Sequence, residues 1–422
     1  MSVTAIVGAQ WGDEGKGKIV DLLATQADMV IRYQGGNNAG HTIVNPLGEF
    51  KMHLVPSGIF NPNVTSVIGS GVVVDPGGLL KEIDDLKKAG VSVDNLKISD
   101  RAHVVMPYHA LFDRLEEASA GAGKLGTTQK GIGPVYGDKA TKIGIQMGDL
   151  LDEKFMIERV SSIVEKKNKI LAALYNHPSL SAHSIIEEAL DYGRKLKRHI
   201  VDTQPMIYGA IKEDRKILLE GQLGALRDLD WGIYPYTTSS SPIAGGACTG
   251  AGIPPREIDE VVGVVKAYST CVGEGPMVTE LKDEVGKLLR EKGGEYGATT
   301  GRPRRCGWFD AVATRYSAQL NGFTSMAVMK LDVLDTLPAI KICVAYHDGD
   351  VTYTTFPRTR ILERAMPAYE EMPGWQEPTT KIRSYGKLPA RAKAYLARME
   401  ELVESKISII SVGPGRDETI FV

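Results

Sequence analysis

The stretch from Val3 to Leu23 reads VTAIVGAQWGDEGKGKIVDLL, and its two ends predict different secondary structures. Val3 to Val7 is a short apolar run rich in β-branched residues, which is typical of a buried strand. Lys18 to Leu23 has its apolar residues at helical spacing. A glycine-rich turn separates the two. A strand, loop and helix in this order begin an α/β unit, and such a loop can turn its N–H groups toward an anion.

The glycine loop departs from the usual phosphate-binding pattern G-x-x-x-x-G-K-[ST] at two positions. Gln10 stands where the first glycine is expected, and Gly17 stands where a Ser or Thr would hold magnesium. Another group must then hold the metal, and Asp13 is the candidate. Lys16 can place a positive charge on phosphoryl oxygens. A tight turn with solvated charges is the alternative, but the position after a strand favours phosphate binding.

The rest of the chain continues the alternation of strands and helices. We therefore predict an α/β fold with a large central, mostly parallel sheet flanked by helices, starting with a P-loop-like phosphate loop. The segment of about 149–214 is rich in Lys, Glu, Leu and Ile at helical spacing, and predicts a helical insertion within one domain, 1–422. The other predicted strands are 29–33, 67–74 (with a turn), 216–220, 326–330, 341–346 and 407–412, and the helices are 79–89 and 387–404.

Composition restricts the classes of function. Lys and Arg total 50 and Asp and Glu total 52, so the net charge of −2 does not favour sequence-independent nucleic-acid binding. Any anion site must therefore be local. The four cysteines are too widely spaced for a zinc cluster, and we expect buried thiols in a reducing compartment. The N-terminus resembles no signal peptide, and no apolar run reaches membrane-spanning length, so we predict a cytoplasmic protein without membrane contact.

Two further loops have the residue types expected of phosphate-binding loops. Gln34 to Thr42 follows the second predicted strand, and we expect it to meet the first loop at the ends of adjacent strands. There Asn38 offers an amide, and His41 could act as a general acid or a phosphate ligand. A lone histidine is more often a surface or core residue. Gly126 to Pro134 holds adjacent threonines between glycines, which suits phosphate recognition. A flexible surface loop explains this pattern equally well.

Two later segments have charged side chains that are predicted to bind ligands. Gly297 to Arg305 holds three arginines and two threonines, and arginine binds carboxylates and phosphates through two hydrogen bonds. A solvated run of charge is the alternative. Lys330-Leu331-Asp332 closes an apolar strand. Its aspartate can accept from the N1–H and 2-amino groups of guanine, which adenine lacks, so it favours GTP over ATP. An ordinary ion pair at a strand end is the competing interpretation.

Taken together, these segments resemble the adenylosuccinate synthetase family in order and spacing over essentially the whole chain. The resemblance implies a GTP-dependent carbon–nitrogen ligase of AMP biosynthesis. It would join L-aspartate to IMP through a 6-phosphoryl intermediate, giving adenylosuccinate, GDP and phosphate, with Mg²⁺ and as a homodimer. The segments that carry the resemblance are QWGDEGKGK, RYQGGNNAGHT, GTTQKGIGP, YPYTTSS, KAYST, GATTGRPRR, KLDVLD and IISVGPGR.

The resemblance also implies residue roles. Asp13 would be the base at N1 of IMP, His41 the acid at the γ-phosphate, and Lys16 would assist. Asp13 and the Gly40 carbonyl would hold magnesium. The GTP site would comprise Gly12, Asp13, Glu14, Gly15, Lys16, Gly17, Lys18, Gly40, His41, Thr42, Arg304, Lys330, Leu331, Asp332, Ser411, Val412 and Gly413. The IMP site would comprise Asp13, Lys16, Asn38, Ala39, Gly40, His41, Thr128, Gln222, Leu223, Thr238, Arg302 and Lys142, which would reach the partner's site. The aspartate site would comprise Val272, Ala298, Thr299, Thr300, Gly301, Arg302 and Arg304.

The departures from the family pattern cluster on the acceptor side. Lys142 replaces an arginine, Leu223 replaces a glutamine with Gln222 beside it, and Trp231 replaces a histidine. Asn37 and Lys130 also differ from the pattern. One alternative is therefore a divergent member that joins aspartate to another purine nucleotide. Two others are a GTPase switch and a non-catalytic nucleotide-binding protein. Phosphate release that requires GTP, aspartate and acceptor together would separate these possibilities.

Overall fold

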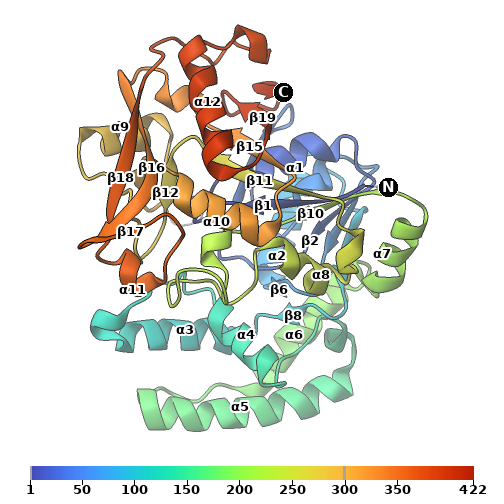
Figure 1. The fold of residues 1–422 in the computed structure, drawn as a ribbon. Coiled ribbons are helices and arrows are strands. Elements are labelled where there is room, and N and C mark those ends of the chain that lie inside the picture. The colour runs from blue at the N-terminus through green and yellow to red at the C-terminus, as the bar shows by residue number, and fades with distance from the viewer. Residues whose placement is uncertain (1, 298–300) are drawn as a thin grey trace.

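The computed structural model describes residues 2–297 and 301–422, and its centre is a ten-stranded sheet (Figure 1). The strand order is β20-β19-β15-β11-β1-β10-β2-β5-β7-β9. Every pair is parallel except β19–β20, so the predicted mostly parallel α/β sheet is confirmed. The strands are β1 (Ser2–Gly8), β2 (Met29–Arg32), β5 (Thr65–Ile68), β7 (Leu96–Ser99), β9 (Ile200–Val201), β10 (Lys216–Glu220), β11 (Glu260–Lys266), β15 (Ser325–Met329), β19 (Ile407–Ser411) and β20 (Thr419–Phe421).

Strand β1 lies in the interior of this sheet because its side chains are apolar on both faces. Val3, Ala5, Ile6 and Val7 are fully buried, as expected for a parallel strand covered by helices on both sides. One expectation is wrong: β1 and β2 are not adjacent, because β10 lies between them. A segment about 190 residues beyond β2 supplies this strand, and no local pattern near the two glycine loops could reveal it.

Helices pack around the sheet, and α3 to α6 gather on one side of the molecule (Figure 1, lower part). The predicted insertion of about 149–214 contains α5, α6 and α7, but also β9, which pairs with β7 at the sheet edge. The division into domains stays a prediction. The helices are α1 (Lys16–Ala24), α2 (Pro76–Lys88), α3 (Pro107–Ser119), α4 (Ile132–Ala140), α5 (Glu153–Tyr175), α6 (Ala182–Leu196), α7 (Thr203–Lys212), α8 (Ala244–Ala251), α9 (Glu284–Lys292), α10 (Ala311–Asn321), α11 (Thr359–Leu362) and α12 (Ala390–Val403).

Four small sheets complete the architecture of the described residues. The pair β12–β13 matters most for the site, because it places Cys271 opposite Arg305 and so joins two segments predicted to bind aspartate. The remaining strands are β3 (His41–Asn45), β4 (Gly48–Met52), β6 (Val73–Val74), β8 (His103–Val104), β12 (Ser269–Cys271), β13 (Arg305–Gly307), β14 (Phe309–Asp310), β16 (Ala339–Asp348), β17 (Val351–Tyr353) and β18 (Met366–Pro373).

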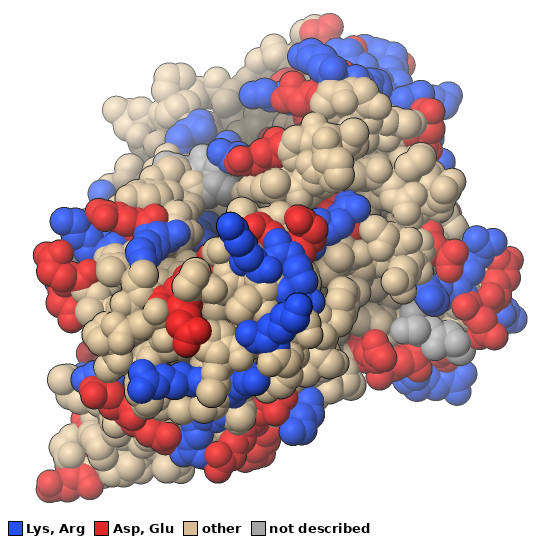
Figure 2. Space-filling model, turned by 90° about the horizontal axis from the view of Figure 1, so that it is seen from above, with Lys and Arg blue, Asp and Glu red and all other residues tan. Residues whose placement is uncertain are grey.

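The surface carries both signs of charge. Figure 2 shows basic and acidic side chains interspersed over the face seen from above. Groups that bind anions must therefore act through local clusters and not through a field of one sign over this face. Within residues 2–297 and 301–422, the structure has no helix that is long and apolar enough to cross a membrane.

Candidate active site

The predicted ligand loops gather where the parallel strands of the main sheet end. β1 leads into the first glycine loop, β2 into the second, β15 into Lys330 and Asp332, and β19 into Ser411 to Gly413. Since the carboxyl ends of parallel strands meet at one edge, loops from distant parts of the chain come together there. This edge is the candidate active site.

Glu14 holds the first glycine loop from inside. Its buried carboxylate accepts hydrogen bonds from the backbone N–H of Gln10 (3.0 Å) and of Gly12 (2.9 Å), and from Lys16 Nζ (2.6 Å). A Cβ on Gly8 would lie 2.4 Å from Glu14 Oε2, so a glycine is needed beside this carboxylate. Glu14 therefore organises the loop, and the neighbouring Asp13 has a left-handed φ of 60°.

The contact between the two glycine loops explains why this chain lacks a Ser or Thr at position 17. A Cβ on Gly17 would lie only 2.9 Å from the Cβ of His41. Real Cβ atoms rarely approach so closely, so any side chain at this position would push the second loop away. The glycine that departs from the usual phosphate-loop pattern therefore leaves the space in which His41 packs against α1.

His41 forms a buried pair with Glu220 at the end of β10. The Nδ1 atom lies 2.5 Å from Glu220 Oε1, and Ser57 donates to the same carboxylate through its N–H (2.8 Å) and its hydroxyl (2.7 Å). Burial lowers the pKa of His41 and outweighs the opposite effect of Glu220. With Nδ1 donating to Glu220, Nε2 is left buried with no partner in the described structure, and it can face a ligand.

Three other predicted ligand residues also present a buried polar atom without a partner in the described part of the chain. These atoms are Oδ1 of Asn38, Oγ1 of Thr238 and Oδ1 of Asp332. Such atoms are costly in a folded protein and are concentrated where a ligand or water completes the hydrogen bonding. Burial also raises the pKa of Asp332. These atoms, together with Nε2 of His41, mark places where a polar ligand would be stabilised.

Gln222 uses its side chain to hold the second glycine loop. Its Oε1 accepts from the Gly36 N–H (3.0 Å), and its Nε2 donates to the carbonyls of Gly36 (2.7 Å) and Ala39 (3.0 Å). A Cβ on Gly35 would lie 1.6 Å from the Gln222 Oε1, so this loop closes tightly over the amide. Gln222 thereby fixes the backbone on both sides of Asn38. The neighbouring Leu223 has a left-handed φ of 61°.

Arg304 joins the aspartate segment to the first glycine loop. Its Nε donates to Asp13 Oδ2 (2.9 Å), and one of its terminal nitrogens donates to Glu295 Oε2 (2.6 Å). Burial opposes the charged guanidinium, but the two carboxylates outweigh burial and raise the pKa of Arg304. Arg304, which is predicted to bind the substrate aspartate, therefore contacts Asp13, the predicted base, directly.

The predicted guanine end is held by Lys18. Its Nζ donates to Ser411 Oγ (2.7 Å) and to the carbonyl of Gly413 (2.8 Å), which ties α1 to the loop after β19. Burial lowers the pKa of Lys18 to about 8. The start of α1, which follows the first glycine loop, is therefore hydrogen-bonded to the loop after β19.

Several predicted residues are less buried. Thr128 is half-buried, while Gly301 and Arg302 are exposed. Lys142 is exposed with φ 64°, and its carbonyl accepts from Arg159 (2.6 Å). Three predicted aspartate ligands, Ala298, Thr299 and Thr300, lie outside the described residues.

Several residues that organise the site were not singled out from the sequence, among them Glu220, Lys266 and Arg227. Glu220 and Lys266 each close an apolar strand, and a charge at that position was the available signal. Arg227 had none: its buried guanidinium donates to the Val272 carbonyl (2.7 Å), and its carbonyl accepts from the Thr238 N–H (2.8 Å). It thus links a predicted aspartate ligand to a predicted IMP ligand.

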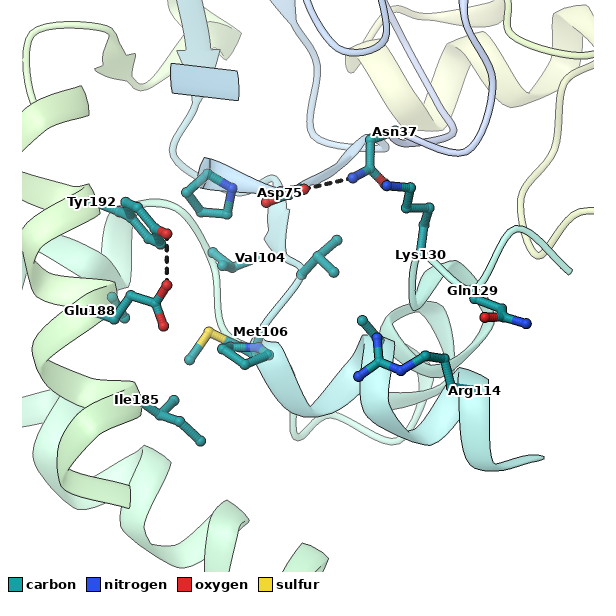
Figure 3. Close-up of a pocket in the computed structure, with 15 residues that line it drawn as sticks. Asn37, Asp75, Val104, Met106, Arg114, Gln129, Lys130, Ile185, Glu188 and Tyr192 are labelled. Atoms are coloured by element: carbon teal, nitrogen blue, oxygen red, sulfur yellow. Dashed lines mark hydrogen bonds between the residues drawn. The ribbon is translucent and has the colours of Figure 1, made fainter. Parts of the chain in front are cut away.

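A hollow of about 240 Å³ lies beside the second glycine loop (Figure 3). Asn37 donates to Asp75 (2.7 Å) on its upper side, and Tyr192 donates to Glu188 (2.7 Å) on α6. Arg114 and Lys130 border the opposite side. Among residues 2–297 and 301–422, none of the predicted ligand residues lines this hollow, which adjoins the candidate site at the second glycine loop.

Comparison with known proteins gives a consistent result. The model of the adenylosuccinate synthetase family matches residues 5–420. The chain is 55% identical to adenylosuccinate synthetase from Caldanaerobacter subterraneus subsp. tengcongensis, over 100% of this chain and 99% of that protein. It is 53% identical to the enzyme of that name from Heliobacterium modesticaldum, with the same coverage. The structure of fully ligated adenylosuccinate synthetase from Plasmodium falciparum has a TM-score of 0.94 at 37% identity and covers 100% of both chains. The chain therefore belongs to the adenylosuccinate synthetase family.

Proposed function

We propose that this protein joins L-aspartate to IMP at the expense of GTP, giving adenylosuccinate, GDP and phosphate. Membership of the family and the names of the relatives support this reaction. Among the structural observations, the buried unpartnered atoms of Asn38, His41, Thr238 and Asp332 around one sheet edge carry the proposal. The IMP acceptor, the triphosphate and the guanine base would each complete some of them.

Asp13 begins the reaction in this mechanism. Its carboxylate takes the N1 proton of IMP, so that the 6-oxygen attacks the γ-phosphorus and the bond to the β,γ-bridging oxygen breaks. The free amine of aspartate then attacks C6 and the C6–O bond breaks. The departing phosphate takes the proton that the amine nitrogen loses, and Asp13 returns the N1 proton to solvent. Arg304 Nε lies 2.9 Å from Asp13 Oδ2 and holds the carboxylate in place.

His41 supports transfer of the phosphoryl group through Nε2. The neutral ring in the buried pair with Glu220 has no proton on this atom. A triphosphate brings negative charge to Nε2 and favours uptake of a proton, while Glu220 stabilises the resulting imidazolium. The acid is therefore formed when its substrate is present. Lys16, held by Glu14 at 2.6 Å, adds a fixed positive charge nearby.

The residues present also fit a magnesium ion. Asp13 is only partly buried and offers a carboxylate, and Gly40 offers a backbone carbonyl in the adjoining loop. Magnesium is commonly held by one or two protein oxygens together with substrate phosphates, so this small donor set suffices. When bound, the ion would neutralise charge on the phosphates.

Phosphate release tests the reaction directly. We expect release only when GTP, aspartate and IMP are all present, and adenylosuccinate should form in equal amount. GMP and dGMP serve as alternative acceptors, since Lys142, Leu223 and Trp231 depart from the family pattern. Negligible turnover of IMP beside rapid turnover of another purine nucleotide would identify a divergent member. Release with GTP alone would identify a GTPase.

Asp332→Asn should change the preferred base of the triphosphate. Asparagine offers an N–H where the carboxylate offered only acceptors, so it no longer matches the N1–H and 2-amino donors of guanine but can donate to the 2-oxo group of xanthine. We expect KM for GTP to rise about a hundredfold and KM for xanthosine triphosphate to fall. KM for IMP is the internal control. Unchanged selectivity between the two triphosphates would place guanine elsewhere.

We also propose that the protein is a homodimer in which Lys142 reaches the partner's site. The exposed position of Lys142 in the single chain supports this. Mixing inactive Asp13→Asn and Lys142→Ala subunits should restore activity, because one of the two sites in each mixed dimer is intact. About a quarter of the wild-type activity is expected at equal concentrations. Failure to recover activity despite demonstrated exchange of subunits would refute the shared site. The cytoplasmic location stays a prediction.

A further inference from the structure

Glu295 is a buried carboxylate at the junction of three segments of the candidate site. It is fully buried and accepts from Lys266 Nζ (2.8 Å), Arg304 (2.6 Å) and Lys330 Nζ (2.9 Å). The hydroxyl of Tyr268 also donates to it (2.5 Å). One carboxylate therefore binds three cations, and two of them, Arg304 and Lys330, are predicted ligands of aspartate and guanine.

Direct ion pairs set the charge of this cluster. Burial alone would raise the pKa of Glu295, but Lys266, Lys330 and Arg304 hold it well below its usual range, so the group stays ionised. The three cations form ion pairs with two carboxylates, Glu295 and Asp13, and Lys330 also interacts electrostatically with Asp332. The substrates GTP and aspartate are both anions and would bind to Arg304 and Lys330 while Glu295 holds these cations.

The backbone around Glu295 fixes the same neighbours. The Arg304 N–H donates to the Glu295 carbonyl (2.9 Å), and Lys330 Nζ donates to the Gly293 carbonyl (2.5 Å). Lys330 itself has a left-handed φ of 60° at the end of β15. The two long side chains would otherwise have several rotamers, and Glu295 restricts them to one arrangement.

We propose that Glu295 is a positioning residue that fixes Arg304 and Lys330 together and thereby couples the aspartate site to the guanine site. The inference rests on the proposed function and extends it, since Glu295 itself would touch no substrate. Its buried carboxylate would act only through the two cations. Its loss should weaken the binding of aspartate and of GTP and leave the binding of IMP unchanged.

Glu295→Gln tests this coupling. An amide cannot accept strongly from three cations, and its own N–H₂ faces them. We expect KM for aspartate and KM for GTP each to rise at least about tenfold, while KM for IMP stays within about threefold. Tyr268→Phe removes one donor and keeps the charge, so it should move the same two constants by a smaller factor. The control is Glu370→Gln, which removes a half-buried carboxylate paired with Arg398 (2.7 Å) outside the site. All three constants should stay unchanged in that control.

The outcomes separate positioning from general support of the fold. Circular dichroism and thermal unfolding first establish that each variant is folded. Unchanged constants for aspartate and GTP, or an equal loss for all three substrates, would overturn the proposal. If Glu295→Gln does not fold, Tyr268→Phe decides in the same way. Calorimetric titration with GDP measures the guanine half without turnover. If the wild-type protein binds GDP but does not use IMP, the proposed function is refuted. GDP binding by Glu295→Gln then still tests the role of Glu295 at the guanine site.

Discussion

Asp13→Asn should lower kcat by several powers of ten while the affinities for IMP and GDP change little. Asparagine has almost the same shape, and it tolerates the left-handed conformation of this position (φ 60°). It cannot take the N1 proton of IMP, and its neutral oxygen is a poorer ligand for magnesium. Rapid-quench measurement of 6-phosphoryl formation, combined with calorimetric binding of IMP and GDP, separates chemistry from binding.

Asp214→Asn is the matched control for this substitution. Asp214 also has a left-handed φ (55°), but it is exposed in the turn between α7 and β10. The control should keep wild-type kcat, which shows that an aspartate-to-asparagine change in this conformation is harmless by itself. Near-normal turnover of Asp13→Asn would remove Asp13 from the role of base.

His41→Asn should lower kcat by about two to four powers of ten, the range expected for loss of a general acid. The substitution removes Nε2, the ring atom that lies buried without a partner, while a small polar side chain remains near Glu220. Glu220→Gln should have a smaller effect on kcat, because the ring remains but its imidazolium loses the stabilising carboxylate. Single-turnover measurement of GDP formation gives the rate of the step concerned.

His53→Asn serves as the control, since His53 also pairs with a glutamate, Glu82, at 3.1 Å. It should leave kcat unchanged. If His41→Asn raised KM for GTP but kept kcat, His41 would bind the triphosphate without acting as an acid. If Glu220→Gln were as damaging as His41→Asn, the pair would act as one unit.

The candidate ligand residues could be proposed from local sequence. The glycine loops at 8–17 and 34–42 and the Lys330–Asp332 motif each follow a strand whose apolar pattern is readable, while the arginine-rich segment is visible from its composition. Among the predicted ligands, Asn38, His41, Thr238 and Asp332 have the buried unpartnered atoms that a ligand would complete. Functional chemistry concentrated in short segments is visible without a structure, because the backbone geometry of such loops depends on nearby glycines.

The partners of these residues could not be predicted in the same way. Glu220 faces His41 only because β10 enters the sheet between β1 and β2. Glu295 lies in a plain glycine-rich stretch, and its importance comes from three cations that belong to β11, β13 and β15 or their neighbouring loops. Contacts over such sequence separations depend on strand order, which apolar patterns leave open.

By itself, the sequence determined that this chain forms a parallel α/β sheet, that glycine loops leave its strands, and which side chains those loops offer. The tertiary structure alone decided which carboxylate holds each cation predicted to act in catalysis or binding, why position 17 must be glycine, and which strand lies beside β1. The physical reason is that backbone conformation and burial patterns act over a few residues. Pairing of buried charges and close approach of loops depend on atoms that only the folded chain brings within a few ångströms.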